Sequence, residues 1–151
     1  YISQHIYMTF ISPSHRELVR SYGTLFARVV VGVFFISAGV GKVGTGFGLG
    51  AGFAGTVGYV GSVGLPMPEA LTLAAAVLEI GGGLGVLLGF YFAEAAAALT
   101  LVCVFTAIFF HGNMSDPMQK VQMFKNLSIA GGLLYMIGYG SGTGWKISCH
   151  Y

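Results

Sequence analysis

Charged residues are scarce in this chain. Asp, Glu, Lys and Arg together make up 8% of the sequence, whereas ordinary soluble domains carry about 25%. A soluble domain with so few charges would have too little polar surface to cover itself, so the composition excludes an ordinary soluble fold. The formal charge of +2, spread over scattered Lys and Arg residues, also argues against a nucleic-acid-binding protein.

Patterns that bind metals, cofactors or disulfide partners are missing as well. The two cysteines, Cys103 and Cys149, are far apart and form no CxxC pair, so no disulfide framework is predicted. The four histidines show no metal-ligand spacing, and the glycines do not follow a strand as a nucleotide-binding loop requires. We therefore predict no metal and no covalently bound cofactor. The sequence starts at Tyr1, and whether a targeting peptide preceded it stays open.

Long apolar runs are abundant. A helix needs about 20 apolar residues to cross the hydrocarbon core of a bilayer, and four segments meet this requirement. The sequence therefore predicts an all-α, polytopic membrane protein with a four-transmembrane-helix bundle. The expected spans are 24–43, 67–90, 91–112 and 121–140. A tight turn at 89–92 should make the second and third spans an antiparallel hairpin.

The flanking segments suggest a simple division of the chain. Ser14 with Glu17 three residues later is a capping box, which predicts that a short amphipathic helix begins there. Arg16 and Arg20 make this helix basic, as expected at a membrane surface. The expected parts are an interfacial arm and short helix at 1–23, a four-helix membrane domain at 24–145 and a tail at 146–151.

Residues 44–65 contain nine glycines. The segment is too apolar for a solvated linker and too rich in glycine to predict a regular helix. We expect an irregular or partly helical connection that lies at the membrane interface or dips into it. Because irregular backbone is not tolerated against lipid at depth, the connection should be covered by the bundle, be covered by a partner, or stay in the headgroup region.

Glycine also predicts where helices touch. Gly81, Gly85 and Gly89 form two overlapping GxxxG units in the second span, and Gly32 and Gly39 are seven residues apart in the first. Small residues let helix backbones approach closely in a membrane. We therefore predict packing contacts at these five glycines.

Glu79 is the single acid in the middle of the second span. Counting along the helix places it about 18 Å deep, where a charge costs roughly 2.5–3.5 kcal/mol. The side chain should therefore face the bundle interior, opposite the GxxxG units, so that the second span is packed on both sides. Its partner stays open: Arg28, Lys125, or, for a protonated Glu79, a hydroxyl such as Ser37 or Ser128.

The other ionisable residues are expected near the helix ends. Four spans place both ends of the domain on one membrane side, named side A, and the opposite side is named side B. Arg28 and Glu94 lie near side A and are the most plausible ion pair there. Lys42 and Lys125 lie near side B, where Lys42 is expected to extend towards the surface. His111, at the end of the third span, should bind a carbonyl or a quinone head group.

Several of these residues resemble the pattern of DoxX-like membrane proteins. "ARVVVGVFFISAGVGKV" resembles their first span, with an Arg near its start and a Lys at its end. "GLPMPEALTLAAAVLEIGGGLGVLLGF" resembles the second, with an intramembrane Glu and a glycine run, and "KNLSIAGGLLYMIGYG" fits the last. The resemblance covers residues 24–145 and carries over Arg28, Lys42, Glu79, His111 and Lys125. Two departures are Glu94, where the family often has a basic residue, and the long glycine-rich connection.

The resemblance implies a four-helix membrane subunit, and some members associate with quinone-linked oxidoreductases such as thiosulfate:quinone oxidoreductase. We therefore expect a non-catalytic accessory subunit of a larger electron-transfer or quinone-linked, respiratory-type assembly. One alternative is a quinone-reactive oxidoreductase subunit in which Glu79 and His111 transfer protons. A small-molecule permease is the least expected, because the bundle has few spans and no inverted repeat.

The expected partners are membrane lipid and other membrane subunits. The surfaces for these subunits would be the arm at 1–23, the connection at 44–65 and the GxxxG face of the second span. Quinone or lipid is the expected small molecule, and nucleic acid is not expected. The expected location is a bacterial inner membrane or a mitochondrial inner membrane.

Overall fold

Every regular element in the described part of the chain is a helix. The computed structural model describes residues 12–44 and 49–142, and no strand occurs among them. The elements are α1 (Pro13–Leu18), the π-helical turn η1 (Val19–Gly23), α2 (Thr24–Val43), α3 (Gly52–Ser62), α4 (Pro68–Leu88), α5 (Phe92–Phe110) and α6 (Pro117–Tyr139). The predicted all-α class is confirmed, while 1–11 and the tail at 146–151 lie outside the described residues.

Local sequence sets the ends of the long helices. Pro68 and Pro117 lie in the first turns of α4 and α6, where a missing N–H breaks no helical hydrogen bond. Asp116 caps α6, because its side chain accepts a hydrogen bond of 2.8 Å from Met118 N. Gly89 ends α4 with φ of 72°, a left-handed conformation that glycine adopts freely. The chain then turns at once into α5, so the predicted hairpin is confirmed.

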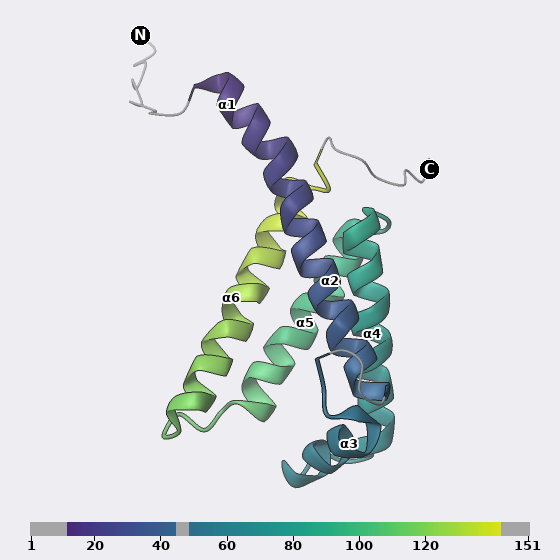
Figure 1. Ribbon diagram of the computed structural model, residues 1–151. Coiled ribbons are helices and arrows are strands. Elements are labelled where there is room, and N and C mark those ends of the chain that lie inside the picture. The colour runs from purple at the N-terminus through teal and green to yellow at the C-terminus, as the bar shows by residue number, and fades with distance from the viewer. Residues whose placement is uncertain (1–11, 45–48, 143–151) are drawn as a thin grey trace.

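The N-terminal helix begins before the predicted capping box. Ser12 is the N-cap, and its Oγ accepts a hydrogen bond of 3.3 Å from His15 N. The prediction that Ser14 and Glu17 start the helix is therefore wrong, because Pro13 favours the first helical position. In Figure 1, α1 continues directly into α2 and projects beyond the other helices.

Three helical stretches among the described residues are long and apolar enough to cross a membrane: Ser14–Val43, Pro68–Leu88 and Phe92–Phe110. In the apolar 18-residue windows of these stretches only 22% to 33% of the residues are buried in the protein, and many large apolar side chains are exposed, as lipid contact requires. α6 has 23 residues but is less apolar, since its first half carries two lysines and several amides.

The long helices pack in the order α2, α4, α5, α6 (Figure 1). α2 and α6 come together mainly at the end near α1, where the Arg20 guanidinium lies over the Tyr139 ring at 5.6 Å. The buried apolar core connects all four helices. It consists of Phe35, Val86, Phe92, Ala96, Leu99, Cys103, Ala130, Leu133 and Met136.

The glycine-rich connection contains the short helix α3, which packs on α4 and α2. After α2 the chain folds back along this helix. Leu49 N donates a hydrogen bond of 2.9 Å to Ser37 O of α2. Gly41 lies so close to Leu49 and Gly50 that a side chain there would clash with their backbone. α3 lies beside the end of α2 (Figure 1), so the connection is partly helical, as predicted. Most of its described residues are exposed and Val60 is buried, so the bundle does not cover the connection as a whole.

Candidate functional site

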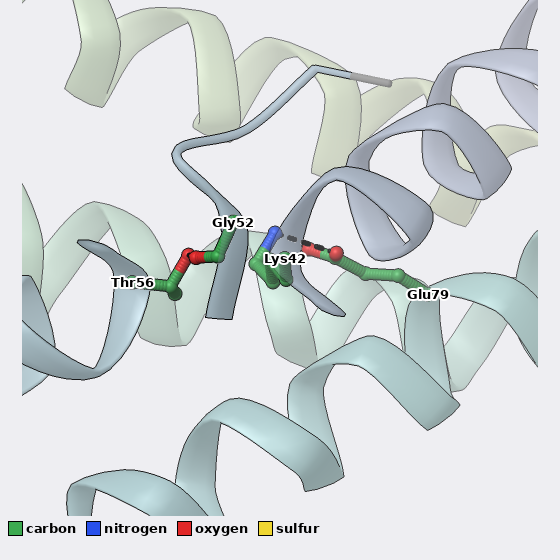
Figure 2. A network of polar contacts seen from close by, with 4 residues as sticks. All are labelled: Lys42, Gly52, Thr56 and Glu79. Atoms are coloured by element: carbon green, nitrogen blue, oxygen red, sulfur yellow. Dashed lines mark hydrogen bonds and ion pairs between the residues drawn. The ribbon is translucent and has the colours of Figure 1, made fainter. Parts of the chain in front are cut away.

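An ion pair joins α2 to α4 inside the bundle. Lys42 Nζ donates to Glu79 Oε2 at 2.6 Å, and the two side chains are 23% and 7% exposed. In Figure 2, the Lys42 side chain lies between Glu79 and the first turn of α3, where Thr56 Oγ1 donates to Gly52 O at 2.8 Å. The structure thus places Glu79 towards neighbouring helices and gives it a charged partner.

The close packing of α2 on α4 sets this pairing. A Cβ at Gly39 would lie 2.7 Å from Ile80 Cγ1 and 2.9 Å from Ala76 O, so α2 has no room for a side chain there. This contact places the last turn of α2 beside the middle of α4, one turn from Glu79. Lys42 therefore reaches the carboxylate from a helix end that lies within the bundle.

Two predictions about the pair are corrected. The partner of Glu79 is Lys42 instead of Arg28 or Lys125, and Lys42 does not simply extend to the surface. Both predictions counted depth from the expected ends of the spans. The pairing depends instead on the offset between the two helices, because the contact of Gly39 with Ala76 and Ile80 places the end of α2 beside the middle of α4, and α3 packs on α2 as well.

Arg28 forms a second junction between helices. Its side chain is fully buried, Nε donates to Val86 O at 3.0 Å, and Nη2 donates to Leu87 O at 2.9 Å. Nη1 donates to Ser141 O at 3.2 Å, just after α6. The guanidinium thus binds carbonyls at the C-terminal end of α4, where helical carbonyls lack intrahelical donors and the helix dipole favours a cation.

The predicted ion pair between Arg28 and Glu94 is wrong. Within residues 12–44 and 49–142, the ion pair is the one between Lys42 and Glu79, and Glu94 is exposed in the first turn of α5. The acceptors of Arg28 are backbone carbonyls, which carry no signature in the sequence. Glu94 instead lies near a helix N-terminus, where the helix dipole favours an acid.

Other polar groups lie near the Lys42–Glu79 pair. Cys103 of α5 is buried, as predicted, and both Glu79 and Lys125 are close enough to act electrostatically on its thiol. Thr72 lies two helical turns before Glu79 on α4, and its buried Oγ1 has no hydrogen-bond partner within the described part of the chain. Sequence reasoning missed Thr72, although the seven-residue spacing from Glu79 places both on one helix face.

His111 ends α5 and is half buried. Its Nδ1 lies 2.7 Å from Gln119 Oε1 in the first turn of α6. The hydrogen bond links the two ends of the α5–α6 connection, so the observed partner is an amide of the chain itself. Among the described residues, no group of three or more His, Cys, Asp or Glu side chains is placed to hold a metal ion.

The predicted packing glycines differ in what they contact. A Cβ at Gly32 would lie 2.7 Å from Leu87 Cβ, and one at Gly85 would lie 2.7 Å from Ala95 Cβ. Both positions, like Gly39, are helix contacts. Gly89 is the C-cap of α4. The prediction for Gly81 is wrong, because a Cβ there would meet nothing within 4 Å among the described residues.

The open side of Gly81 lies in a shallow apolar groove between α4 and α5. Its volume is about 400 Å³, and it ends near the hairpin turn. The second span therefore packs against α2 on one side and against α5 at Gly85, while its surface around Gly81 is open. The lining residues include Val77, Leu78, Gly81, Leu84, Tyr91 and Ala98.

The internal charges of this chain connect helices. Lys42–Glu79 and the Arg28 cluster each join α2 to α4, and apolar side chains cover the outer surface of the three apolar stretches. A helical bundle with an outer apolar surface and paired interior charges is the arrangement that a bilayer requires. The fold and the site therefore define an integral membrane protein.

Comparison with known proteins places this chain in a family. The DoxX family model matches residues 23–112, which run from the end of η1 to the end of α5, and the chain belongs to the DoxX family. It is 34% identical over 121 residues to the inner membrane protein YqjF of Escherichia coli (strain K12), covering 80% of this chain and 86% of that protein. No solved structure matches the chain.

Proposed function

We propose that the chain is a four-span, non-catalytic subunit of a larger complex in a bacterial inner membrane. The observation that carries this proposal is the use of its buried charges. Lys42 and Glu79 bind each other across α2 and α4 at 2.6 Å, and Arg28 binds three backbone carbonyls from two further segments. The buried charged side chains therefore hold the helices together, and this is a structural role.

α6 is the proposed fourth span. Its 23 residues extend about 34 Å at 1.5 Å per residue, enough for a hydrocarbon core of about 30 Å. Ala130 and Leu133 bury one face of α6 in the same core as α5. The helix therefore runs beside a membrane-spanning neighbour for most of its length.

The kind of complex and its location follow from relatives. The DoxX resemblance favours an electron-transfer or quinone-linked assembly, because some members of that family associate with quinone-linked oxidoreductases. The similarity to a bacterial inner membrane protein supports the bacterial location, and no observation supports the mitochondrial one. Quinone or lipid remains the proposed small molecule.

The size of the native particle tests this proposal. After extraction from native membranes in mild detergent, we expect the 15.8 kDa chain to migrate within a larger assembly in native electrophoresis and mass spectrometry. Crosslinking in the membrane before extraction controls for dissociation by the detergent. A solitary chain in both samples would contradict the proposal.

A second candidate function is that of a quinone-reactive subunit. The specific observation is the unequal exposure of the pair, since Lys42 is 23% exposed and Glu79 only 7%. A proton can thus reach an internal carboxylate through one accessible partner, and the function would use Glu79 and His111 as proton carriers.

Substitution of the two proposed carriers tests the second candidate. Glu79→Gln and His111→Ala should each abolish reduction of a soluble quinone analogue by the purified assembly, because neither replacement side chain takes up and releases a proton as an acid–base catalyst must. The assembly mass should not change. Glu69→Gln, at an exposed acid in the first turn of α4, is the matched control. Full turnover in both carrier variants would exclude this function.

A further inference from the structure

One face of α6 has no partner in the described part of the chain. Its members recur every three or four residues, which places them on one side of a helix. All of them are exposed. We name this face the α6 stripe, and its residues are Val121, Lys125, Ser128, Gly132 and Tyr135.

Lys125 is the unusual member of the stripe. It lies eight residues after Pro117, about 12 Å along the helix, and five residues before Ala130 of the buried core. It is therefore placed between the start of α6 and the core of the bundle. Lysine at such a depth normally pairs with an acid or reaches the surface along its stem.

The chain offers no acidic side chain for Lys125. The five acids are Glu17, Glu69, Glu79, Glu94 and Asp116. All five lie in the described residues, and the ion pair found there uses Glu79 for Lys42. No acidic side chain among the described residues is thus paired with Lys125, whereas a carboxylate of another molecule would neutralise it.

Two further features of α6 favour contact of its exposed face with another protein. α6 is absent from the stretches apolar enough to cross a membrane by themselves, so its exposed face is poorly suited to lipid. Gly132, two turns beyond Lys125, has nothing within 4 Å of a Cβ position among the described residues. A helix backbone can approach closely there.

A second copy of this chain is a poor occupant. A two-fold axis along the membrane normal brings identical residues together at the same depth. Lys125 would then face Lys125 across the interface, and two like charges repel strongly where the dielectric is low. The charge of the stripe therefore favours a different subunit.

We propose that the α6 stripe binds a transmembrane helix of another subunit, which carries a carboxylate at the depth of Lys125. The proposal rests on the proposed function as a subunit and names the chemistry of its partner. The acid neutralises Lys125, and the backbone of the partner helix packs against Gly132.

Photocrosslinking in native membranes tests the proposal. We replace Tyr135 with benzoylphenylalanine, a photoreactive aromatic residue of similar shape, in the full-length chain. We expect a crosslink to a different polypeptide. The crosslink should be lost in Lys125→Glu and kept in Lys125→Arg, and it should persist in Lys120→Glu, the same charge reversal at an exposed position one turn nearer the helix start.

Charge exchange then identifies the acid. Reversing the crosslinked partner's acidic residue to Lys should restore the crosslink with Lys125→Glu. Restoration by the exchanged pair would show that Lys125→Glu still folds, whereas a crosslink that stays lost in the exchanged pair would overturn the proposal.

Other outcomes separate the two proposals. A crosslink to a second copy, a crosslink to lipid alone, or an undiminished crosslink in Lys125→Glu would overturn this inference. The proposed function would survive each of these results if the chain still migrates in a larger assembly. A solitary chain without any crosslink would overturn both.

Discussion

Replacing Lys42 with methionine is expected to destabilise the protein by about 3–5 kcal/mol, the usual loss when one partner of a buried ion pair is removed. The substitution leaves the Glu79 carboxylate, 7% exposed, without its partner at 2.6 Å. Unfolding in detergent micelles, followed by circular dichroism, measures this loss. The loss should shrink in acidic buffer, because protonation of Glu79 removes the unpaired charge.

The reverse substitution should be milder. Glu79→Gln leaves Lys42, whose side chain is 23% exposed and can turn its ammonium group towards the surface. The double variant Lys42→Met with Glu79→Met should recover much of the loss, because no charge is left unpaired. Glu94→Gln, at an exposed acid of α5, is the control. If Lys42→Met were as stable as the control, the result would contradict a stabilising role for the Lys42–Glu79 ion pair.

Substituting Gly83 with valine is expected to destabilise the α2–α4 contact by about 1–3 kcal/mol, or more if the helices cannot separate. A Cβ at Gly83 would lie 2.9 Å from Gly32 O and 3.0 Å from Ile36 N. Both atoms belong to the backbone of α2, which cannot move aside as a flexible side chain would. The same detergent unfolding experiment measures the effect.

Gly81→Val provides a matched control on the same helix. Gly81 faces the apolar groove and has nothing within 4 Å of its Cβ position among the described residues. The free energy of unfolding of Gly81→Val should therefore stay within about 0.5 kcal/mol of that of the unchanged chain, as for most exposed substitutions. Equal losses at the two glycines would show that the α2–α4 contact does not depend on close backbone approach.

The spans were the most predictable part of the fold. Bilayer thickness fixes the length of apolar sequence a helix needs, so 24–43, 67–90 and 91–112 predicted α2, α4 and α5 to within a few residues. The face of Glu79 was also predictable. Helical spacing places it with Gly82, Gly83 and Val86, all of which are buried.

The partners of the charges were not predictable, because sequence spacing gives no offset between helices. Lys42 reaches Glu79 because the close contact at Gly39 places the end of α2 beside the middle of α4. The acceptors of Arg28 are backbone carbonyls, which every residue possesses. The GxxxG spacing likewise predicted close packing at Gly81, but it did not show that this face of α4 is open.

Arg28 also has a consequence for biogenesis. It is made with the first span, yet one of its acceptors, Ser141 O, lies 113 residues further along the chain. Until those later segments are synthesised, its guanidinium lacks the carbonyls that it binds in the finished protein, and an isolated arginine in hydrocarbon is costly. The first helix should therefore stay near water or phosphate groups during insertion and settle to its final depth only when the last helix arrives.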